Sequence, residues 1–358
     1  MNLFLYLSFY VFILFSILGY GSIFHKFFLK KEKINLGYFG FFGIFSLLII
    51  SYTLNMFIPL SAYINLSILL IGLLYFLNFL CKKFFEIKNN FFLIGIIFLF
   101  LIPFILSAKN HDDFQYYHFA YTELITKFPS SLGIGMFNHG FRTPSSIFYL
   151  SSLFYLPKAE YALIHLTPVF FLGFANYIFI NKIYLSLKNK ENFYIVLLSL
   201  SSLALANIFF YRMAEHGTDR SAQIIILIIF IELLQLLNFK KFNVSLLNKI
   251  FILITITISL KAFYLIYMIL LIPIVYYQKE KIFFLINVFK NKIFYLCLCL
   301  FFLVILTNFF NTGCLIYPLS FSCNEKLIWS ISLEQVDAMN HWYQLWSKGG
   351  ATPSGRVQ

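Results

Sequence analysis

Two adjacent aspartates between two histidines form the segment with the clearest potential for chemistry in this sequence. Asp112 and Asp113 follow His111 and precede Tyr116 and His118. A carboxylate in such a segment can act as a general base on a hydroxyl group. The dipole of a helix beginning here would favour one acid without any functional role. Because the chain has only 14 acids, two acids beside two histidines favour function. We take the aspartates as catalytic candidates, with Tyr116 and His118 as substrate-binding candidates.

A second short segment crowds charges between two apolar stretches. It contains Glu215, His216 and Asp219 together with Arg212 and Arg220. Charges at a membrane boundary are costly unless they are paired or used. Pairing of the acids with the two arginines is one explanation, and substrate binding by Glu215, His216 and Asp219 is the other.

Two isolated cations can bind an anionic group. Arg142 precedes a proline at the start of an apolar stretch, where its guanidinium could hold a phosphate through two hydrogen bonds or simply snorkel to lipid headgroups. Lys261 interrupts a long apolar stretch, which favours an anionic partner for its ammonium group. We include both residues in the substrate-binding set.

The cysteines do not suggest a metal site. None of the five has the Cys-x2-Cys spacing of a zinc site, and no nucleotide-binding glycine motif occurs, so we expect neither a metal nor a cofactor. Cys314 and Cys323 share one segment and are expected to form a disulfide in an oxidising compartment. All three tryptophans follow this pair, which suits a membrane interface or sugar stacking.

The composition requires that these residues be positioned by a membrane protein. The chain has 358 residues, of which 61% are hydrophobic and 11% are charged. Soluble domains average roughly 25% charged residues. The sequence therefore predicts an all-α, polytopic integral membrane protein. Its net charge of +13 comes from lysines gathered in short segments, so it indicates membrane topology and not nucleic-acid binding.

Apolar stretches long enough to cross a bilayer predict eight spans. They lie at 2–24, 35–58, 62–80, 91–108, 160–181, 192–211, 220–239 and 293–310. The stretch 246–277 is read as two short helices meeting near Lys261, because one long helix would place the last lysine-rich segment on the wrong side. About ten spans result, with the N-terminus outside and all five lysine-rich segments in the cytoplasm.

This topology divides the chain into three parts. Residues 1–90 form a three-span extension, 91–310 form the core with an outer catalytic loop at 109–159, and 311–358 form an outer tail that is possibly truncated. Within the loop, the apolar stretch 144–157 is bounded by prolines and is expected to lie flat in the outer interface.

In this order the segments resemble the GT-C superfamily of membrane glycosyltransferases, particularly the branch with the protein O-mannosyltransferases and the lipid A aminoarabinose transferase. Residues 112–116, Asp-Asp-Phe-Gln-Tyr, resemble its Asp-Glu-x-x-Tyr motif. Residues 143–149 resemble its proline-containing juxtamembrane helix, Asp219 stands where it has an acid before a span, and 259–262, Ser-Leu-Lys-Ala, resemble its Leu-Thr-Lys-Gly turn. The resemblance covers roughly residues 91–280. Three extra spans, Asp113 in place of Glu and Ala262 in place of Gly depart from the pattern.

The resemblance implies transfer of a sugar from a polyprenyl-phosphate donor to a glycan or glycolipid acceptor. Asp112 would deprotonate the acceptor hydroxyl, and Lys261 and Arg142 would face the donor phosphate. Such an enzyme would work in cell-envelope glycan synthesis, on the outer face of a bacterial cytoplasmic membrane.

Two other functions remain open. An O-antigen polymerase or ligase would rely on Arg142, His139, Arg212 and His216 more than on Asp112. A lipid-linked glycan transporter would need a polar path, yet the predicted spans carry little charge apart from Glu232.

Overall fold

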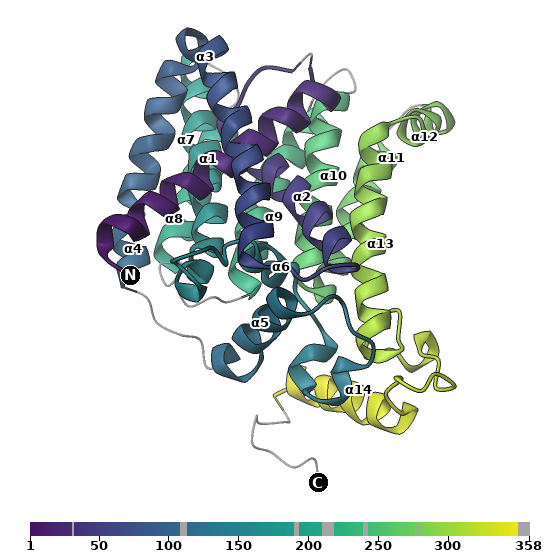
Figure 1. Ribbon diagram of the computed structural model, residues 1–358. Helices are drawn as coiled ribbons and strands as arrows, with labels where there is room; N and C mark the ends of the chain where they lie inside the picture. The colour runs from purple at the N-terminus through teal and green to yellow at the C-terminus, as the bar shows by residue number, and fades with distance from the viewer. Residues whose placement is uncertain are drawn as a thin grey trace.

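The chain folds into a helical bundle with a smaller helical tail at one end (Figure 1). The computed structural model describes residues 1–30, 32–107, 113–189, 193–209, 218–238, 243–277 and 280–349, and these contain helices and connections but no β-strand. One continuous hydrophobic core extends from Tyr10 to Val304. The predicted parts 1–90 and 91–310 therefore share a core, whereas the tail has a small core of its own around Cys314 and Tyr317.

Among the described residues, six helical stretches are long and apolar enough to cross a membrane, and three shorter ones are also apolar. The long helices are α1 (Leu3–Phe28), α2 (Leu36–Asn55), α3 (Ala62–Phe100), α7 (Thr167–Lys188), α9 (Thr218–Asn238) and α13 (Lys292–Thr312). The shorter apolar segments are α8 (Phe193–Phe209), α10 (Val244–Leu260) and η6 (Ala262–Leu270) with α11 (Leu271–Tyr276). The remaining elements are α4 (Ile102–Leu106), η1 (Phe114–His118), α5 (Phe119–Lys127), η2 (Ile134–Met136), η3 (His139–Arg142), α6 (Ser146–Ser152), η4 (Tyr161–Leu166), α12 (Lys281–Phe289), η7 (Ser320–Ser322) and α14 (Leu333–Ser347).

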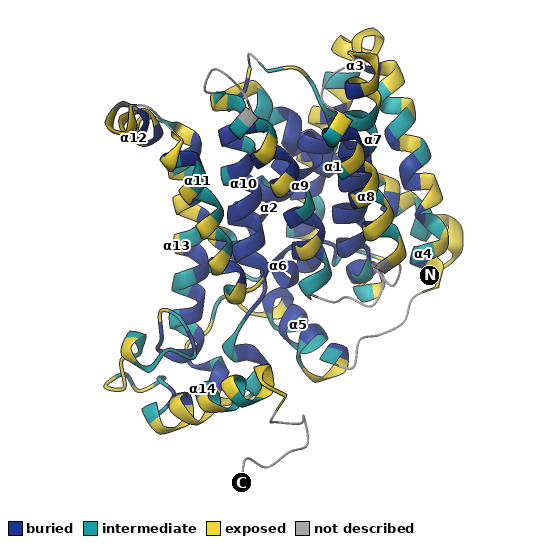
Figure 2. Ribbon diagram, turned by 180° about the vertical axis from the view of Figure 1, so that it is seen from behind, coloured by how far each residue is buried: buried dark blue, intermediate teal, exposed yellow. Residues whose placement is uncertain are grey.

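The apolar outer surface of the bundle suits a bilayer. Large apolar side chains such as Phe4, Phe85, Phe92 and Ile282 are more than 70% exposed. In Figure 2, α1, α3 and α12 carry many exposed residues, while α2 and α10 are mostly buried. Exposed apolar surface of this extent marks contact with membrane or protein. The fold is that of an all-helical integral membrane protein.

Helix α3 covers two of the predicted spans because it folds back on itself. The rings of Phe76 and Phe91 are 6.1 Å apart, and both contact Phe15 of α1. A straight helix would separate positions 76 and 91 by about 22 Å along its axis. The turn therefore lies between them, and Figure 1 shows the two limbs of α3 joined at one end of the bundle. The limbs correspond to the predicted spans 62–80 and 91–108.

The predicted break at Lys261 is present. Helix α10 ends at Leu260, Lys261 has an extended backbone, and η6 begins at Ala262. The preceding helix α9 runs antiparallel to α10, with Asp219 near the Lys261 end of the pair and Glu232 near the Lys249 end. We use these two names, the Lys261 end and the Lys249 end, for the two ends of the bundle.

Helix α6 lies within the apolar stretch 144–157, for which the sequence predicts a helix in the outer interface, and it is buried inside the protein. All seven of its residues are buried, and the helix packs against α2, α5, α7 and α10. Its serines have partners inside the bundle, since Ser146 and Ser151 form 2.8 Å hydrogen bonds with Ser259 and Thr167. These contacts satisfy the polar groups that would otherwise keep the helix at the surface.

Three buried asparagines hold the segment 119–155 on the bundle. Asn55 of α2 donates to the carbonyl oxygens of Ile125 and Phe128, at 3.2 and 3.0 Å. Asn65 of α3 and Asn311 of α13 make comparable contacts, described below. Each side chain satisfies irregular backbone that lies against an apolar bundle and has no helical partner there.

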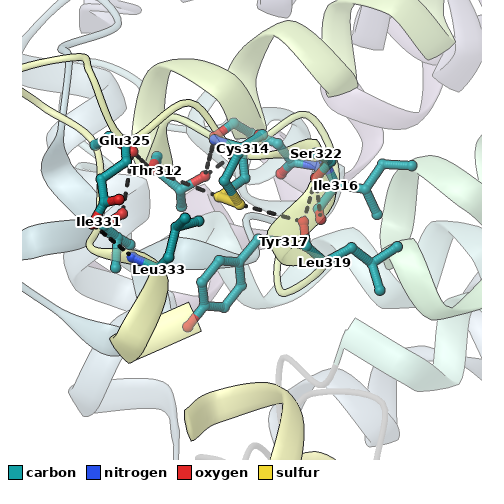
Figure 3. Close-up of a disulfide and its surroundings, with 12 residues drawn as sticks. Thr312, Cys314, Ile316, Tyr317, Leu319, Ser322, Glu325, Ile331 and Leu333 are labelled. Atoms are coloured by element: carbon teal, nitrogen blue, oxygen red, sulfur yellow. Dashed lines mark hydrogen bonds between the residues drawn. A yellow bond between two sulfur atoms is a disulfide. The ribbon is translucent and has the colours of Figure 1, made fainter. Parts of the chain in front are cut away.

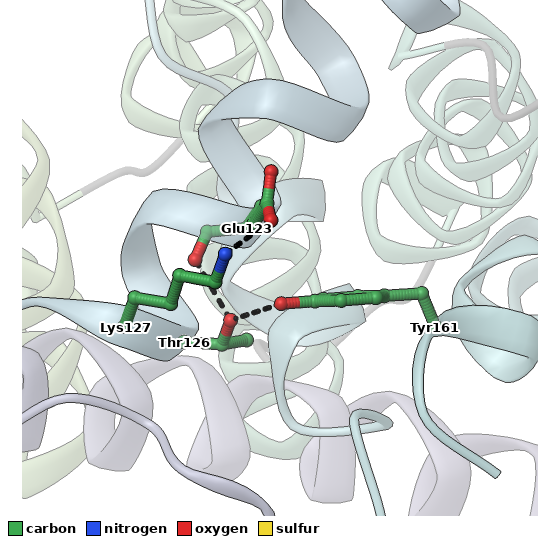
Figure 4. Close-up of polar contacts among 4 residues, drawn as sticks. All are labelled: Glu123, Thr126, Lys127 and Tyr161. Atoms are coloured by element: carbon green, nitrogen blue, oxygen red, sulfur yellow. Dashed lines mark hydrogen bonds and ion pairs between the residues drawn. The ribbon is translucent and has the colours of Figure 1, made fainter.

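A side-chain hydrogen bond ties α5 to η4. Thr126 and Tyr161 share a 2.9 Å hydrogen bond, and Thr126 also donates to the Glu123 carbonyl. Lys127 pairs with the Glu123 carboxylate at 2.5 Å (Figure 4). The bond between Thr126 and Tyr161 thereby links α5 to η4, and the other two contacts lie within α5.

We expect Asn65→Ala to destabilise the protein by about 1–3 kcal/mol, since it removes a buried donor. Asn65 is fully buried and lies 2.7 and 3.0 Å from the carbonyl oxygens of Ser152 and Tyr155. The measurement is the apparent melting temperature in neutral detergent, followed by size-exclusion chromatography of heated samples. Ser67→Ala is the matched control, because the exposed Ser67 bonds only within its own helix. Equal melting temperatures for the two variants would contradict the assigned role.

Candidate functional site

Asp219 and Lys261, 42 residues apart, form an ion pair at the Lys261 end. Lys261 Nζ lies 2.9 Å from Asp219 Oδ2, and the Tyr264 hydroxyl donates to Asp219 Oδ1 at 3.3 Å. Asp219 begins α9 and Lys261 occupies the break after α10, so the antiparallel helix pair brings them together. Both side chains remain almost half exposed and accessible to a ligand.

Asp113 lies beside the hydroxyl of Tyr117. Tyr117 donates to Asp113 Oδ2 at 3.3 Å. The segment Phe114–His118 is a π-helical turn, in which the Phe119 N–H bonds to the Phe114 carbonyl. Such turns are rare and occur frequently at functional sites. The predicted catalytic motif therefore leads into an irregular turn that sets the direction of its side chains.

Tyr117 connects the two acidic positions. Burial raises the pKa of Tyr117, the carboxylate of Asp113 raises it further, and Asp219 adds a weaker effect of the same sign. The hydroxyl thus stays protonated and available as a donor near both acids. Its ring packs on Gly140, where an added Cβ would lie 2.2 Å from Tyr117 Cγ. Only glycine permits this close approach.

Arg142 lies beside the same group of residues, with three neutral acceptors. Its Nε donates to the Gly135 carbonyl at 2.9 Å, Nη1 donates to the Tyr317 hydroxyl at 3.2 Å, and Nη2 donates to Gln335 Oε1 at 3.4 Å. Within the part of the chain that the structure describes, no carboxylate pairs with Arg142. Its positive charge is held in place but not neutralised.

The tail connects Arg142 to Tyr117 through Tyr343. Burial raises the pKa of Tyr343, Tyr317 raises it further, and Arg142 lowers it. Tyr343 in turn contributes to the raised pKa of Tyr117. Helix α14 therefore adds an aromatic side chain between the cation and the acids.

The disulfide Cys314–Cys323 holds the loop that presents Tyr317 (Figure 3). The two cysteines also form an antiparallel bridge, and Ser322 bonds to both Ile316 and Leu319. Gly313 ends α13 with a φ of 77°, a backbone conformation that glycine adopts without strain. The pairing expected from the sequence is thus the pairing in the structure.

Of the two predicted substrate-binding residues Tyr116 and His118, the first is exposed and the second is buried. Tyr116 is 56% exposed, so it can reach a substrate. His118 is 1% exposed and packs on Phe148 and Tyr117. In this position His118 contributes to the packing beneath the site and does not reach its surface.

Three of the predicted site residues, Asp112, Glu215 and His216, lie outside the described residues. The remaining predicted residues Asp113, Tyr116, Arg142, Asp219 and Lys261 lie at one end of the bundle. The sequence alone did not single out Tyr117, Tyr264 or Tyr317. The spacing of four residues between Asp113 and Tyr117 was a usable signal for that pair.

The described ranges contain no group of three His, Cys, Asp or Glu side chains that could hold a metal ion. The site is instead a set of carboxylates, cations and phenols that leaves one ammonium, one guanidinium and two carboxylates accessible. Such a set can bind an anion and accept a proton at separate positions.

Fold and site together define an all-helical integral membrane protein with a polar site at one end of its bundle. The chain belongs to the family described as "Domain of unknown function (DUF8201)", which it matches over residues 1–356. No curated protein and no solved structure matches it.

We expect loss of the disulfide to loosen the loop that carries Tyr317. Closing so short a loop stabilises a fold by about 2–3 kcal/mol. In the double variant Cys314→Ser and Cys323→Ser, trypsin should cleave faster after Lys326, an exposed residue of the same tail. The control replaces the two exposed free cysteines, Cys81 and Cys299, by serine. Equal cleavage rates in both double variants would show that the disulfide does not stabilise the tail.

Proposed function

We propose that this protein is a membrane glycosyltransferase of the GT-C type. It would move a sugar from a polyprenyl-phosphate donor to a glycan or glycolipid acceptor in cell-envelope synthesis. The observation that carries the proposal is the ion pair between Asp219 and Lys261, together with the contact of Tyr117 with Asp113, since Asp219 is near enough to Tyr117 to help raise its pKa. Asp113, Asp219 and Lys261 come from three of the four segments on which the resemblance rests.

The proposed reaction needs a base and a cationic site for the leaving phosphate. The carboxylate pair Asp112 and Asp113 supplies the base, with Asp112 accepting the proton of the acceptor hydroxyl. The acceptor oxygen then attacks the anomeric carbon, the bond from that carbon to the phosphate oxygen breaks, and the polyprenyl phosphate leaves. Tyr117 donates to Asp113 and keeps its carboxylate directed toward the site.

The cations stabilise the charge that develops on the leaving phosphate. Arg142 suits this role because its guanidinium is fixed by neutral groups and keeps its full charge. Lys261 shares its charge with Asp219, and both are exposed enough for the donor to compete for the ammonium group.

The proposal includes a topology of about ten spans, with this site on the outer face of a bacterial cytoplasmic membrane. The turn within α3 and the break at Lys261 support this alternation. The lysines Lys33, Lys182 and Lys249 border one cavity at the opposite end, which is the arrangement that cytoplasmic lysines would have.

The test measures transfer of radiolabelled sugar from polyprenyl-phosphate donors to membrane acceptors at matched expression. We expect Asp112→Asn and Asp113→Asn to lower transfer about 10²-fold or more, the scale of general-base catalysis. Glu123→Gln is the control, because Glu123 is an acid of the same end that pairs only with Lys127. It should keep transfer within twofold of the wild type. Full transfer by both aspartate variants would refute the proposed base.

A second experiment tests whether Arg142 binds the phosphate of the donor. We expect Arg142→Ala to raise the KM for the donor more than tenfold, with a smaller effect on the KM for the acceptor. Arg142→Lys should recover part of the loss, since it restores the charge but not the fork of donors. If wild-type protein transfers no sugar and Arg142→Ala instead changes polymer length in cells, the protein is a polymerase or ligase and the proposed function is wrong.

A further inference from the structure

A polar cavity of about 820 Å³ lies at the Lys249 end, away from the candidate site. Its walls come from the connection before α2, the second limb of α3, the C-terminal end of α7, and parts of α9 and α10. The volume is that of a typical small-molecule site. Asp219 and Glu232 are separated by about 20 Å along α9, so this cavity is independent of the proposed glycosyl-transfer site.

A buried acid is among the residues that line the cavity. Glu232 is fully buried, and its Oε1 lies 2.6 Å from Lys182 Nζ and accepts from the Tyr38 hydroxyl. Its second oxygen, Oε2, is also buried and has no hydrogen-bond partner among the residues with described positions. An ionised carboxylate oxygen left without a donor is costly. The cavity therefore suits a ligand that brings a hydroxyl donor to Glu232.

Two ammonium groups of the cavity are not neutralised by ion pairs. Lys249 stands over the ring of Tyr38, 4.5 Å from its centroid, and Lys33 lines the wall. In the described ranges no carboxylate forms an ion pair with either lysine. Among the described residues, the lining contains three lysines, Lys33, Lys182 and Lys249, and two glutamates, Glu32 and Glu232. These described residues leave one positive charge over.

We propose that this cavity binds a phosphate ester that carries hydroxyl groups. The phosphate contacts Lys249 and Lys33, and a hydroxyl of the same ligand donates to Glu232 Oε2. The glutamate repels a bare phosphate, so one end of the ligand must be anionic and the other a neutral donor. A phosphodiester carries one negative charge and balances the lining. A glycerol-type lipid headgroup is such a phosphodiester. A soluble sugar or glycerol phosphate also combines a phosphate ester with hydroxyl groups, but it is a monoester with up to two negative charges.

The experiment titrates the purified full-length chain in neutral detergent by calorimetry. The probes are short-chain phosphatidylglycerol and soluble glycerol 3-phosphate, with phosphatidylcholine of the same chain length as reference. We expect at least one of the two glycerol phosphates to bind and phosphatidylcholine to bind at least tenfold more weakly. Binding of the lipid alone identifies the bilayer as the source, and binding of the soluble ester identifies the aqueous phase.

Substitutions of the lining residues test whether the ligand binds in this cavity. The double variant Lys33→Gln and Lys249→Gln should weaken the Kd at least tenfold, because it removes both unpaired ammonium groups. Lys188→Gln is the matched control, since Lys188 is an exposed lysine of α7 outside the cavity lining. Glu232→Gln should also weaken binding, but it leaves Lys182 without its carboxylate, so the lysine variants decide. No binding of either glycerol phosphate, equal binding of phosphatidylcholine, or wild-type affinity in the double lysine variant would overturn the proposal.

Discussion

The irregular segment between α4 and α7 depends on buried amide side chains for its position. Backbone without helical hydrogen bonds cannot lie against an apolar bundle unless its polar groups find partners. Asn55, Asn65 and Asn311 supply them from three different long helices, and each is nearly fully buried. Because Asn311 donates to the Phe141 carbonyl, one such contact lies next to Arg142. The candidate site is therefore positioned by polar contacts between helices and loop more than by the helices alone.

In the helix pair α9 and α10, the charged residues lie at the two ends of the pair. Between Asp219 and Glu232 the sequence of α9 is apolar after its first turn, and α10 is apolar between Lys249 and Lys261. An antiparallel arrangement must then place one acid and one lysine at each end, because the apolar middle offers charge no solvation. Asp219 and Lys261 at one end, and Glu232 and Lys249 at the other, follow from this pattern. The ion pair of Glu232 is formed with Lys182, which α7 contributes.

The sequence predicted those structural features that depend on residues close together in the chain. A lysine in a long apolar stretch predicted the break at Lys261, and two cysteines in one segment predicted the disulfide. The burial of α6 inside the protein was not predicted, because it depends on hydroxyl partners such as Ser259, more than 100 residues away. Tyr317 escaped prediction for the same reason, since its contact with Arg142 depends on how the tail folds. The number of spans and the identity of the catalytic base remain predictions from the sequence.

Neither of the two ion pairs contributes much to the stability of the fold. The pair of Asp219 and Lys261 is nearly half exposed, and exposed ion pairs contribute about 0–1 kcal/mol. At the other end, Glu232 with Lys182 is almost fully buried, where loss of hydration offsets most of the attraction between the charges. Apolar residues of similar volume would serve a bundle equally well in that position. Charges placed where they add little to folding are best accounted for by ligands. The accessible pair suits a substrate that exchanges with solvent or membrane, and the buried pair suits a ligand enclosed by the cavity.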